Sequence, residues 1–199
     1  MKHTILSLLR DKNTKMSAFR DAAERLATLL SVEAAQEVKT SPHEVETPLG
    51  KAHGKKLAHE IVLLPILRAG LSMLHPFLKM FPESRVGFLG VKRDEETALP
   101  HHYYTNLPAF SSNQFYIILD PMIATGGSGK VAIEMLKDRG VHEDQILYVG
   151  MVGASEGIAQ LKQAAPKMKI LCAEVDKELN SKKYIVPGLG DFGDRYFGT

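Results

Sequence analysis

The chain has 199 residues, of which 44% are hydrophobic and 24% charged, a composition that excludes disordered, collagen-like and fibrous proteins. Its 25 basic and 23 acidic residues give a net charge of +2, too balanced for a general nucleic-acid binder or a polybasic membrane binder. No apolar run approaches the ~20 residues of a membrane span, and the short run in residues 1–10 is not typical of a signal peptide. The single cysteine, Cys172, cannot close an intrachain disulfide, which fits a cytoplasmic location. We therefore expect one globular domain over residues 1–199.

The first predicted elements are a helix and an irregular segment. Apolar residues spaced by three and four predict an amphipathic helix over residues 17–30, with Ser17 as its N-cap. Residues 38–59 are mostly polar and contain Pro42, Pro48, Gly50 and Gly54, so we expect a loop or a small hairpin there.

A repeating rhythm follows, in which short apolar runs alternate with helical stretches. The apolar runs, predicted as strands, occupy residues 61–67, 85–91, 115–119, 146–152 and 168–175. The helical stretches occupy residues 71–80, 129–139 and 156–164. Continuous apolar strands between helices predict an α/β fold with a mostly parallel sheet flanked by helices on both faces.

Two segments interrupt this rhythm. Residues 92–114 are polar and aromatic, and they are long enough to form a protruding hairpin or lid, which would either close over a substrate or pack on a partner subunit. Residues 182–199 contain four glycines together with several apolar side chains, which argues against a disordered tail.

The segment after the third apolar run has the composition of a phosphate-binding loop. Asp120 follows the strand, and a Thr-Gly-Gly-Ser turn over residues 125–128 opens the next helix. Glycines let backbone N–H groups approach an anion, hydroxyls donate, and the helix N-terminus adds partial positive charge. An ordinary glycine turn with an N-cap is the alternative. A nucleoside-triphosphate P-loop is excluded, because Ala124 stands at its first glycine position and Val131 where a hydroxyl is needed.

Arginines follow two other predicted strands. Arg68 comes after the run 61–67, and Arg93 comes after the run 85–91. A guanidinium group at a strand end suits a pyrophosphate, although either arginine alone could be surface charge. Ligands of open parallel sheets bind beyond the carboxyl ends of the strands, so three such ends with anion-binding groups indicate one shared site.

Four segments together resemble the uracil phosphoribosyltransferases: PILRAG (65–70), KRDEET (92–97), LDPMIATGGS (119–128) and YIVPGLGDFGDRYFGT (184–199). The resemblance implies a phosphoribosyltransferase-like fold with a C-terminal base-binding hood. It also implies transfer of the 5-phosphoribosyl group from phosphoribosyl pyrophosphate (PRPP) to uracil, giving UMP and diphosphate in pyrimidine salvage. Asp120-Pro121 matches this family, whereas related phosphoribosyltransferases usually carry two adjacent acids there.

The resemblance also implies site residues. Arg68 and Arg93 would contact PRPP, Asp120 would accept hydrogen bonds from the ribose hydroxyls, and residues 125–128 would hold the 5′-phosphate. The implied PRPP loop comprises Asp120, Pro121, Met122, Ile123, Ala124, Thr125, Gly126, Gly127 and Ser128. The implied uracil-binding residues are Ile185, Gly190, Asp191 and Phe192. Phe192 stands where many bacterial members carry alanine, which leaves the shape of the uracil pocket open.

The implied cofactor is Mg²⁺, held mostly by substrate oxygens and water. Asp191 also lies toward PRPP and would contact the ion through water, and it is a candidate catalytic residue. Family members form homodimers or homotetramers, and some are activated by GTP. No nucleic-acid or membrane partner is expected. Two rival hypotheses stay open from the sequence: a phosphoribosyltransferase acting on a purine, and a non-catalytic regulator that binds RNA on the same fold, which the near-neutral charge disfavours.

Overall fold

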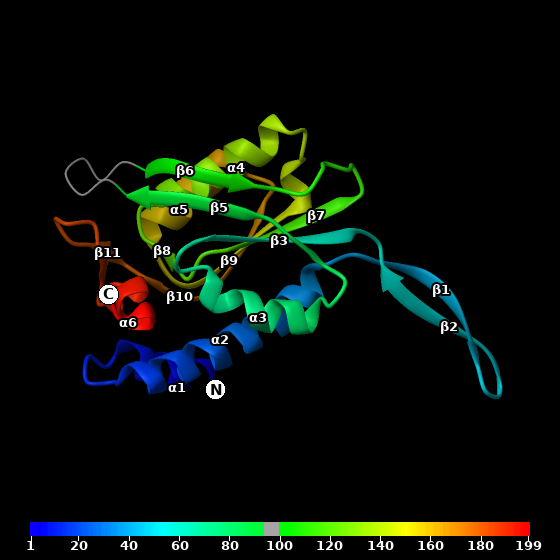
Figure 1. Cartoon of the computed structure of the whole chain (residues 1–199), viewed down its shortest axis with the longest axis horizontal. Coiled ribbons are helices and arrows are strands. Elements are labelled where there is room, and N and C mark those ends of the chain that lie inside the picture. Colours follow the sequence, from blue (N-terminus) through cyan, green and yellow to red (C-terminus); the bar gives the residue numbers. More distant parts are fainter. Residues whose placement is uncertain (94–99) are drawn as a thin grey trace.

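A six-strand path forms the main sheet of the computed structural model, which describes residues 1–93 and 100–199 except the side chains of Arg93 and Pro100 (Figure 1). Along this path the strands are ordered β10-β9-β7-β3-β5-β6. Their bounds are β3 (Glu60–Leu67), β5 (Phe88–Arg93), β6 (Pro100–Asn106), β7 (Gln114–Leu119), β9 (Ile146–Ala154) and β10 (Lys169–Asp176). Two short strands lie off the path: β4 (Arg85–Val86) pairs with β3, and β8 (Met122–Ile123) pairs with β9. Neighbouring strands on the path are parallel except β5 and β6, which confirms the predicted mostly parallel sheet.

Helices cover both faces of this sheet. Alternate residues of the strands point to opposite sides: Leu63 and Ile117 pack in one buried cluster, and Leu64 and Ile118 pack in the other. The first cluster lies against α1 (Lys2–Arg10), α2 (Met16–Glu37), α3 (Leu71–Met80) and α6 (Phe192–Phe197). The second lies against α4 (Gly127–Asp138) and α5 (Ser155–Ala164). Burial on both faces explains why these strands read as continuous apolar runs.

Several predicted boundaries change. Helix α2 begins at Met16 and ends at Glu37, beyond the predicted range 17–30, because Ser31 and Ala34 are also buried on its inner face. The prediction of Ser17 as N-cap is wrong: Lys15 occupies that position, with no side-chain hydrogen bond. The predicted strand 85–91 is divided between β4 and β5 at Gly87, whose N–H donates to the carbonyl oxygen of Leu63.

Two pairs of neighbouring strands form antiparallel hairpins, one outside the main sheet and one at its edge. Strands β1 (Thr40–Thr47) and β2 (Gly50–Leu57) pair in antiparallel fashion and extend away from the sheet (Figure 1), so residues 38–59 contain a hairpin. In the segment 92–114, by contrast, β6 pairs with β5 as the outer strand of the sheet path. The hairpin predicted within residues 92–114 is therefore present as the antiparallel pair β5–β6, and its second strand forms an edge of the main sheet. Residues 94–99, which the lid hypothesis also covers, lie outside the described residues.

The C-terminal segment folds back over one end of the sheet. Short strands β11 (Glu178–Leu179) and β12 (Ile185–Val186) pair in antiparallel fashion, and β12 contacts β9 before the chain enters α6. A single-turn 3₁₀ helix, η1 (Glu143–Gln145), precedes β9. In the part of the chain that the structure describes, no helix is long and apolar enough to cross a membrane.

Candidate active site

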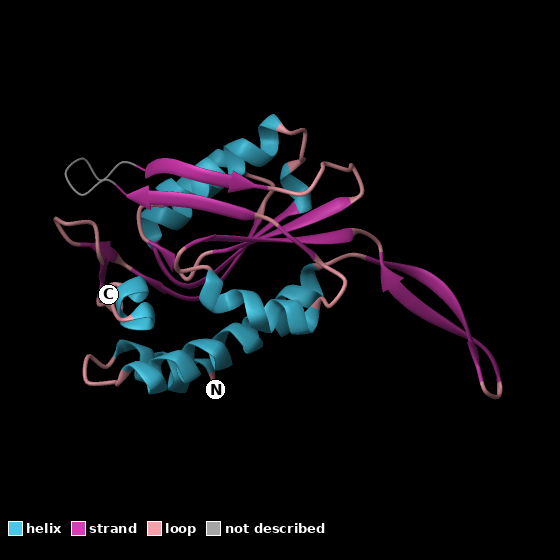
Figure 2. Cartoon of the chain, viewed as in Figure 1, coloured by secondary structure: helices cyan, strands magenta, loops and turns pink. Residues whose placement is uncertain are grey.

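The order of the strands creates a switch point between β3 and β7. From β3 the chain passes through α3 on one face of the sheet to β4 and β5, whereas from β7 it passes through α4 on the other face to β9 (Figure 2). The two central strands are paired in register, with Pro65 opposite Leu119. Loops that leave neighbouring strands in opposite directions open a crevice where ligands bind in this type of sheet. At this switch point Arg68 follows β3 and Asp120 follows β7.

The loop after β3 is pressed against the end of β7. A Cβ atom placed on Gly70 would lie 2.4 Å from the carbonyl oxygen of Leu119 and 2.7 Å from that of Ile66, so this position has room only for glycine. The peptide bond between Leu67 and Arg68 is cis. The Arg68 guanidinium extends toward the C-terminus, where its carbon lies 5.6 Å from the ring centroid of Phe197 and its Nη2 lies 3.5 Å from Oγ1 of Thr199. The structure thus brings two of the predicted segments together.

The loop after β7 rests on β9 and α5. The carbonyl oxygen of Pro121 accepts hydrogen bonds from the N–H groups of Met151 and Val152, at 3.1 and 3.0 Å. A Cβ atom on Gly157 would lie 2.3 Å from the carbonyl oxygen of Ala124, so the loop and the first turn of α5 are in backbone contact. Gly126 adopts a left-handed conformation, with φ of 80°, directly before α4. The loop therefore presents the N-terminus of a 12-residue helix, which suits a phosphate.

Asp120 is held at the base of this loop. Its Oδ2 accepts a hydrogen bond of 2.7 Å from the Tyr148 phenol, and its Oδ1 accepts one of 3.3 Å from the Met122 N–H. Burial raises the pKa of Asp120 to about 6, although both hydrogen bonds act in the opposite direction. The carboxyl group is therefore ionised at neutral pH and becomes protonated as the pH falls through about 6.

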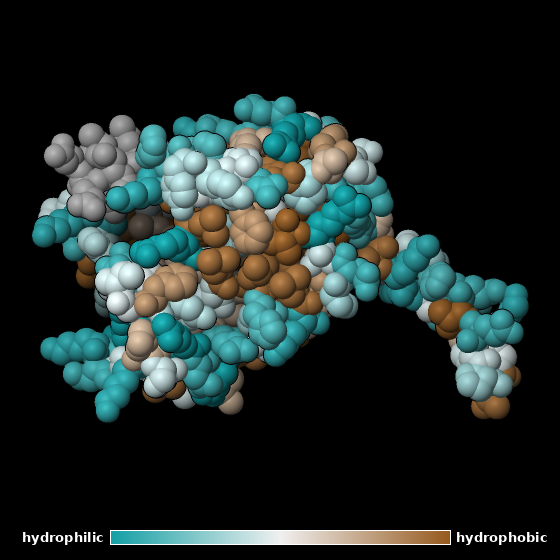
Figure 3. All heavy atoms as spheres, in the orientation of Figure 1, coloured by the Kyte–Doolittle hydropathy of each residue, from teal (hydrophilic) through white to brown (hydrophobic). Residues whose placement is uncertain are grey.

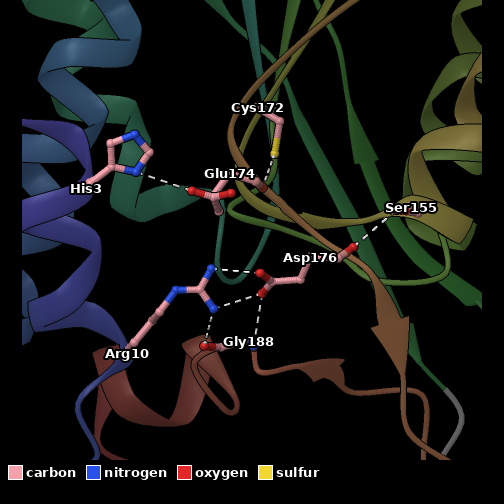
Figure 4. A network of polar contacts seen from close by, with 7 residues as sticks. All are labelled: His3, Arg10, Ser155, Cys172, Glu174, Asp176 and Gly188. Carbon is pink, nitrogen blue, oxygen red and sulfur yellow. Dashed lines mark hydrogen bonds and ion pairs between the residues drawn. The ribbon is translucent and has the colours of Figure 1, made fainter.

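The C-terminal hood is tied to α1 through a polar network (Figure 4). The Arg10 guanidinium donates to both carboxylate oxygens of Asp176, at 2.9 and 2.8 Å, and its Nη1 also donates to the carbonyl oxygen of Gly188. The N–H of Gly188 donates in turn to Oδ2 of Asp176 at 3.0 Å. Burial alone would raise the pKa of Asp176, but the hydrogen bonds from Arg10 and Gly188 outweigh it and hold that pKa below its ordinary value. Both backbone polar groups of Gly188 are thus fixed by one ion pair.

The resemblance implies that the hood binds the base, so we expect Asp176→Asn to weaken uracil binding and also to destabilise the fold. Asp176 is 8% exposed, so the substitution leaves Arg10 without its charged partner, and the free energy of unfolding should fall by about 2–4 kcal/mol at pH 7. The uracil KM should rise several-fold more than the PRPP KM, because the network fixes the hood. The difference from wild type should shrink as the pH falls through the lowered pKa of Asp176, since wild type then loses the same charge.

The exposed Asp21–Arg25 pair of α2 supplies the control for this experiment. Its side chains are 67% and 49% exposed, so Asp21→Asn should change the stability by less than about 0.5 kcal/mol. Chemical denaturation and steady-state kinetics check both variants. Equal uracil KM values in wild type and Asp176→Asn would show that the network does not position the hood.

The remaining predicted site residues have distinct surroundings. The Phe192 ring is 2% exposed and packs 5.3 Å from Phe19 and 5.7 Å from Tyr196, so it belongs to the core beneath α6. Asp191 is exposed, and its Oδ1 accepts the N–H of Asp194 as the N-cap of α6. Ile185 is buried, and Gly190 has a φ of 83°. Arg93 ends β5 at the same end of the sheet, and its side chain lies outside the described residues.

Three polar residues beside these loops were missed by the sequence analysis: Arg10, Asp176 and Tyr148. The Arg10–Asp176 ion pair joins residues 166 positions apart, and no local pattern predicts such a contact. Tyr148 lies inside an apolar run, where a tyrosine reads as a core residue. Only the pairing of β9 with β7 shows that its phenol reaches Asp120.

Comparison with solved structures first defines the class. A hypoxanthine phosphoribosyltransferase from Staphylococcus aureus shares the fold, with a TM-score of 0.52 at 13% identity over 80% of this chain and 76% of that one. The AQ2163 protein from Aquifex aeolicus is much more similar, with a TM-score of 0.91 at 36% identity over 100% of this chain and 94% of that one. The chain thus has the phosphoribosyltransferase fold that the sequence predicts.

Comparison with sequences then defines the family. The family model described as uracil phosphoribosyltransferase matches residues 1–199. A uracil phosphoribosyltransferase from Limosilactobacillus reuteri is 42% identical over 98% of this chain and 92% of its own length. One from Finegoldia magna is 44% identical over 100% of this chain and 94% of its own length. The chain belongs to the uracil phosphoribosyltransferase family.

Proposed function

We propose that this protein transfers the 5-phosphoribosyl group of PRPP to uracil, giving UMP and diphosphate. The observation that carries the proposal is the meeting of three segments of this family member at one end of the sheet. The loop after β7 presents Asp120 and a helix N-terminus, the loop after β3 packs on it, and Arg68 of that loop contacts the C-terminal residues. Family membership favours a pyrimidine acceptor over a purine and an enzyme over an RNA-binding regulator.

The loop supplies complementary groups for a phosphorylated sugar. The Asp120 carboxylate would accept hydrogen bonds from the ribose hydroxyls. The hydroxyls of Thr125 and Ser128 and the N–H groups at the start of α4 would bind the 5′-phosphate. Glycosyl transfer passes through an oxocarbenium-like transition state in which charge develops on the leaving group. Arg68 and Arg93 would neutralise the charge that grows on the departing diphosphate.

The donor set fits Mg²⁺ held mainly by substrate. Among the described residues, no group of three or more His, Cys, Asp or Glu side chains could hold a metal ion. Mg²⁺ keeps several waters and is commonly bound by one or two carboxylates plus substrate phosphates, and the exposed Asp191 would contact it through water. When bound, the ion supplies positive charge beside the diphosphate.

Backbone groups of the hood would recognise uracil. A small planar base read by N–H and C=O groups needs close approach of the main chain, which Gly190 permits. The Phe192 ring packs on Phe19 in the core, so this residue would offer the base its backbone and not its side chain. Asp191, at the start of α6, remains the candidate catalytic contributor of this segment.

Self-association, GTP activation and a cytoplasmic location stay predictions. An apolar area between β5 and α3 on the face shown in Figure 3, together with the extended hairpin β1–β2, supports assembly into dimers or tetramers. Mass measurement in solution, and the activity assay with and without GTP, check the first two.

Radiolabelled uracil incubated with PRPP and Mg²⁺ tests the proposed reaction directly. We expect labelled UMP, and competition by unlabelled uracil but not by cytosine, hypoxanthine or adenine. Folded, concentrated protein that forms no UMP would contradict the proposal. A product formed from hypoxanthine or adenine instead would identify a purine enzyme.

Replacing Arg68 with alanine should raise the PRPP KM by about 10- to 100-fold, the usual effect of losing a charge-assisted hydrogen bond. The uracil KM should change much less. The exposed Arg25 of α2 provides the control, since Arg25→Ala removes the same charge away from the site. If Arg68→Ala leaves the PRPP KM unchanged, Arg68 does not bind PRPP.

A further inference from the structure

One buried tyrosine hydroxyl contacts the PRPP loop from below. Tyr148 lies on β9 with none of its surface exposed, and its register partner on β7 is Ile118, two residues before Asp120. This pairing places the phenol beneath the end of β7, where its O–H donates to Oδ2 of Asp120 at 2.7 Å. The contact lies within the second buried cluster, among apolar side chains of the sheet and of α4 and α5.

The same phenol also touches the other end of the loop. A Cβ atom on Gly129, in the first turn of α4, would lie 2.7 Å from the Tyr148 phenol oxygen and 2.7 Å from Cδ2 of Leu161. Helix α4 therefore packs directly on the tyrosine. The side chain fills the space between Asp120, where the loop begins, and the first turn of the helix, where the loop ends.

We infer that Tyr148 is a positioning residue for phosphoribosyl transfer: its phenol O–H orients the Asp120 carboxylate and favours its ionised form for binding the ribose hydroxyls. This inference rests on the proposed function, because it assigns the ribose to Asp120. Because Tyr148 lies in an apolar run, residue types alone give no sign of this role.

Such a donor suits the role proposed for Asp120. An ionised carboxylate is acceptor-only and can receive both ribose hydroxyls, whereas a protonated one carries a proton of its own and accepts less well. Burial raises the pKa of Asp120, and the hydrogen bond from Tyr148 counteracts this rise. Burial and the neighbouring carboxylate raise the pKa of Tyr148 well above its ordinary value, so the phenol remains a donor throughout the working pH range.

Few other groups titrate near Asp120. Among the described residues, the titratable groups that interact with it are the Tyr148 phenol of β9 and the Cys172 thiol of β10. Burial raises the pKa of Cys172 to about 11, so this thiol stays neutral below pH 9. The phosphate groups of PRPP also ionise at about pH 6, so the shift of the acid limb of kcat/KM between variants, which share the same substrate, reports the ionisation of Asp120.

The test compares Tyr148→Phe with Tyr116→Phe. Tyr116 lies on β7 in the same buried cluster, is 2% exposed, and donates its O–H to Oε1 of Gln114 at 2.8 Å near the opposite end of the strand. Each substitution removes one buried hydroxyl group, from β9 in Tyr148→Phe and from β7 in Tyr116→Phe. In Tyr148→Phe the acid limb of kcat/KM for PRPP should move upward by about one pH unit, the usual effect of one hydrogen bond to a charge. The loss should then be about fivefold at pH 6 and small at pH 8.5.

The Tyr116→Phe profile should coincide with that of wild type. Site-specific 3-fluorotyrosine at position 148 keeps the shape of the ring and makes the phenol a stronger donor, so it should move the acid limb downward. This protein serves as the test if Tyr148→Phe does not fold. If the enzyme forms UMP but neither Tyr148→Phe nor 3-fluorotyrosine at position 148 moves the acid limb, the inference about Tyr148 is wrong and the proposed function stands. A wild-type protein that forms no UMP would instead contradict the proposed function.

Discussion

Asp120→Asn should abolish most of the transferase activity and yet make the ligand-free protein more stable. The amide keeps the shape of the side chain but loses the charge, so the two charge-assisted hydrogen bonds that we propose to the ribose hydroxyls would become weaker. We expect kcat/KM for PRPP at pH 8 to fall by about 100- to 1,000-fold. The contribution of Asp120 to the acid limb near pH 6 should vanish with it, because the variant has no carboxyl group to titrate at this position, and the ionisation of the substrate phosphates should remain.

The gain in stability follows from the raised pKa of Asp120. This pKa is about 6 in the folded chain against an ordinary value of 3.8, so ionisation opposes folding. The loss of folding stability caused by this ionisation is absent below pH 3.8, grows between pH 3.8 and about 6, and is complete above about 6. Each unit of pKa difference between the folded and unfolded chain corresponds to about 1.36 kcal/mol. Asp120→Asn should therefore raise the free energy of unfolding at pH 7–8 by up to about 3 kcal/mol. This difference should disappear toward pH 4.

Urea denaturation at pH 4 and at pH 8, with steady-state kinetics on the same samples, checks both expectations. Asp21→Asn, which removes an exposed carboxylate from α2, should leave stability and kinetics close to those of wild type. A variant less stable than wild type at pH 8 would show that the carboxylate is favourably placed without substrate. If Asp120→Asn had the same kcat/KM for PRPP as wild type, Asp120 would not bind the ribose.

Burial explains which elements the sequence predicts. Strands β3, β7 and β9 can be predicted from the sequence because both of their faces are covered, which makes them continuous apolar runs. The turn after β7 can be predicted because glycine and hydroxyl residues follow a carboxylate. The hairpin β1–β2 is almost wholly exposed, so it has no apolar alternation that could mark its strands. The buried C-terminal part of α2 carries Ser31 and Ala34, which give little periodic signal.

The polar supports of the site depend on contacts that cross the sheet. The Tyr148–Asp120 hydrogen bond requires the pairing of β7 with β9, and the Arg10–Asp176 pair requires α1 to lie beside the end of β10. Neither requirement is expressed in residue types close together in the chain. The burial of the Phe192 ring likewise depends on Phe19 of α2, far away in the sequence. Residues that would meet the ligand are thus easier to predict than residues that hold them.

Gly70→Ala should strongly weaken PRPP binding, because the new Cβ atom would collide with backbone atoms. The new Cβ atom would lie 2.4 Å from the Leu119 carbonyl oxygen and 2.7 Å from the backbone nitrogen and oxygen of Ile66. These are main-chain atoms of β7 and β3, which cannot yield as a flexible side chain does. The loop carrying Arg68 must therefore move away from Asp120. We expect kcat/KM for PRPP to fall by about 100-fold or more and the free energy of unfolding to fall by about 2–3 kcal/mol.

Gly54→Ala in the hairpin is the matched control, because its Cβ would approach no atom closer than 3.3 Å, the carbonyl oxygen of His43. Its stability should stay within about 0.5 kcal/mol of wild type. Combining Gly70→Ala with Arg68→Ala separates the displacement of the loop from the loss of a charge. If the glycine acts by moving Arg68, the double variant should bind PRPP little worse than Gly70→Ala alone. Full additivity of the two losses would show that Arg68 keeps its contact with PRPP in Gly70→Ala, and that the backbone collision acts on the loop after β7 instead.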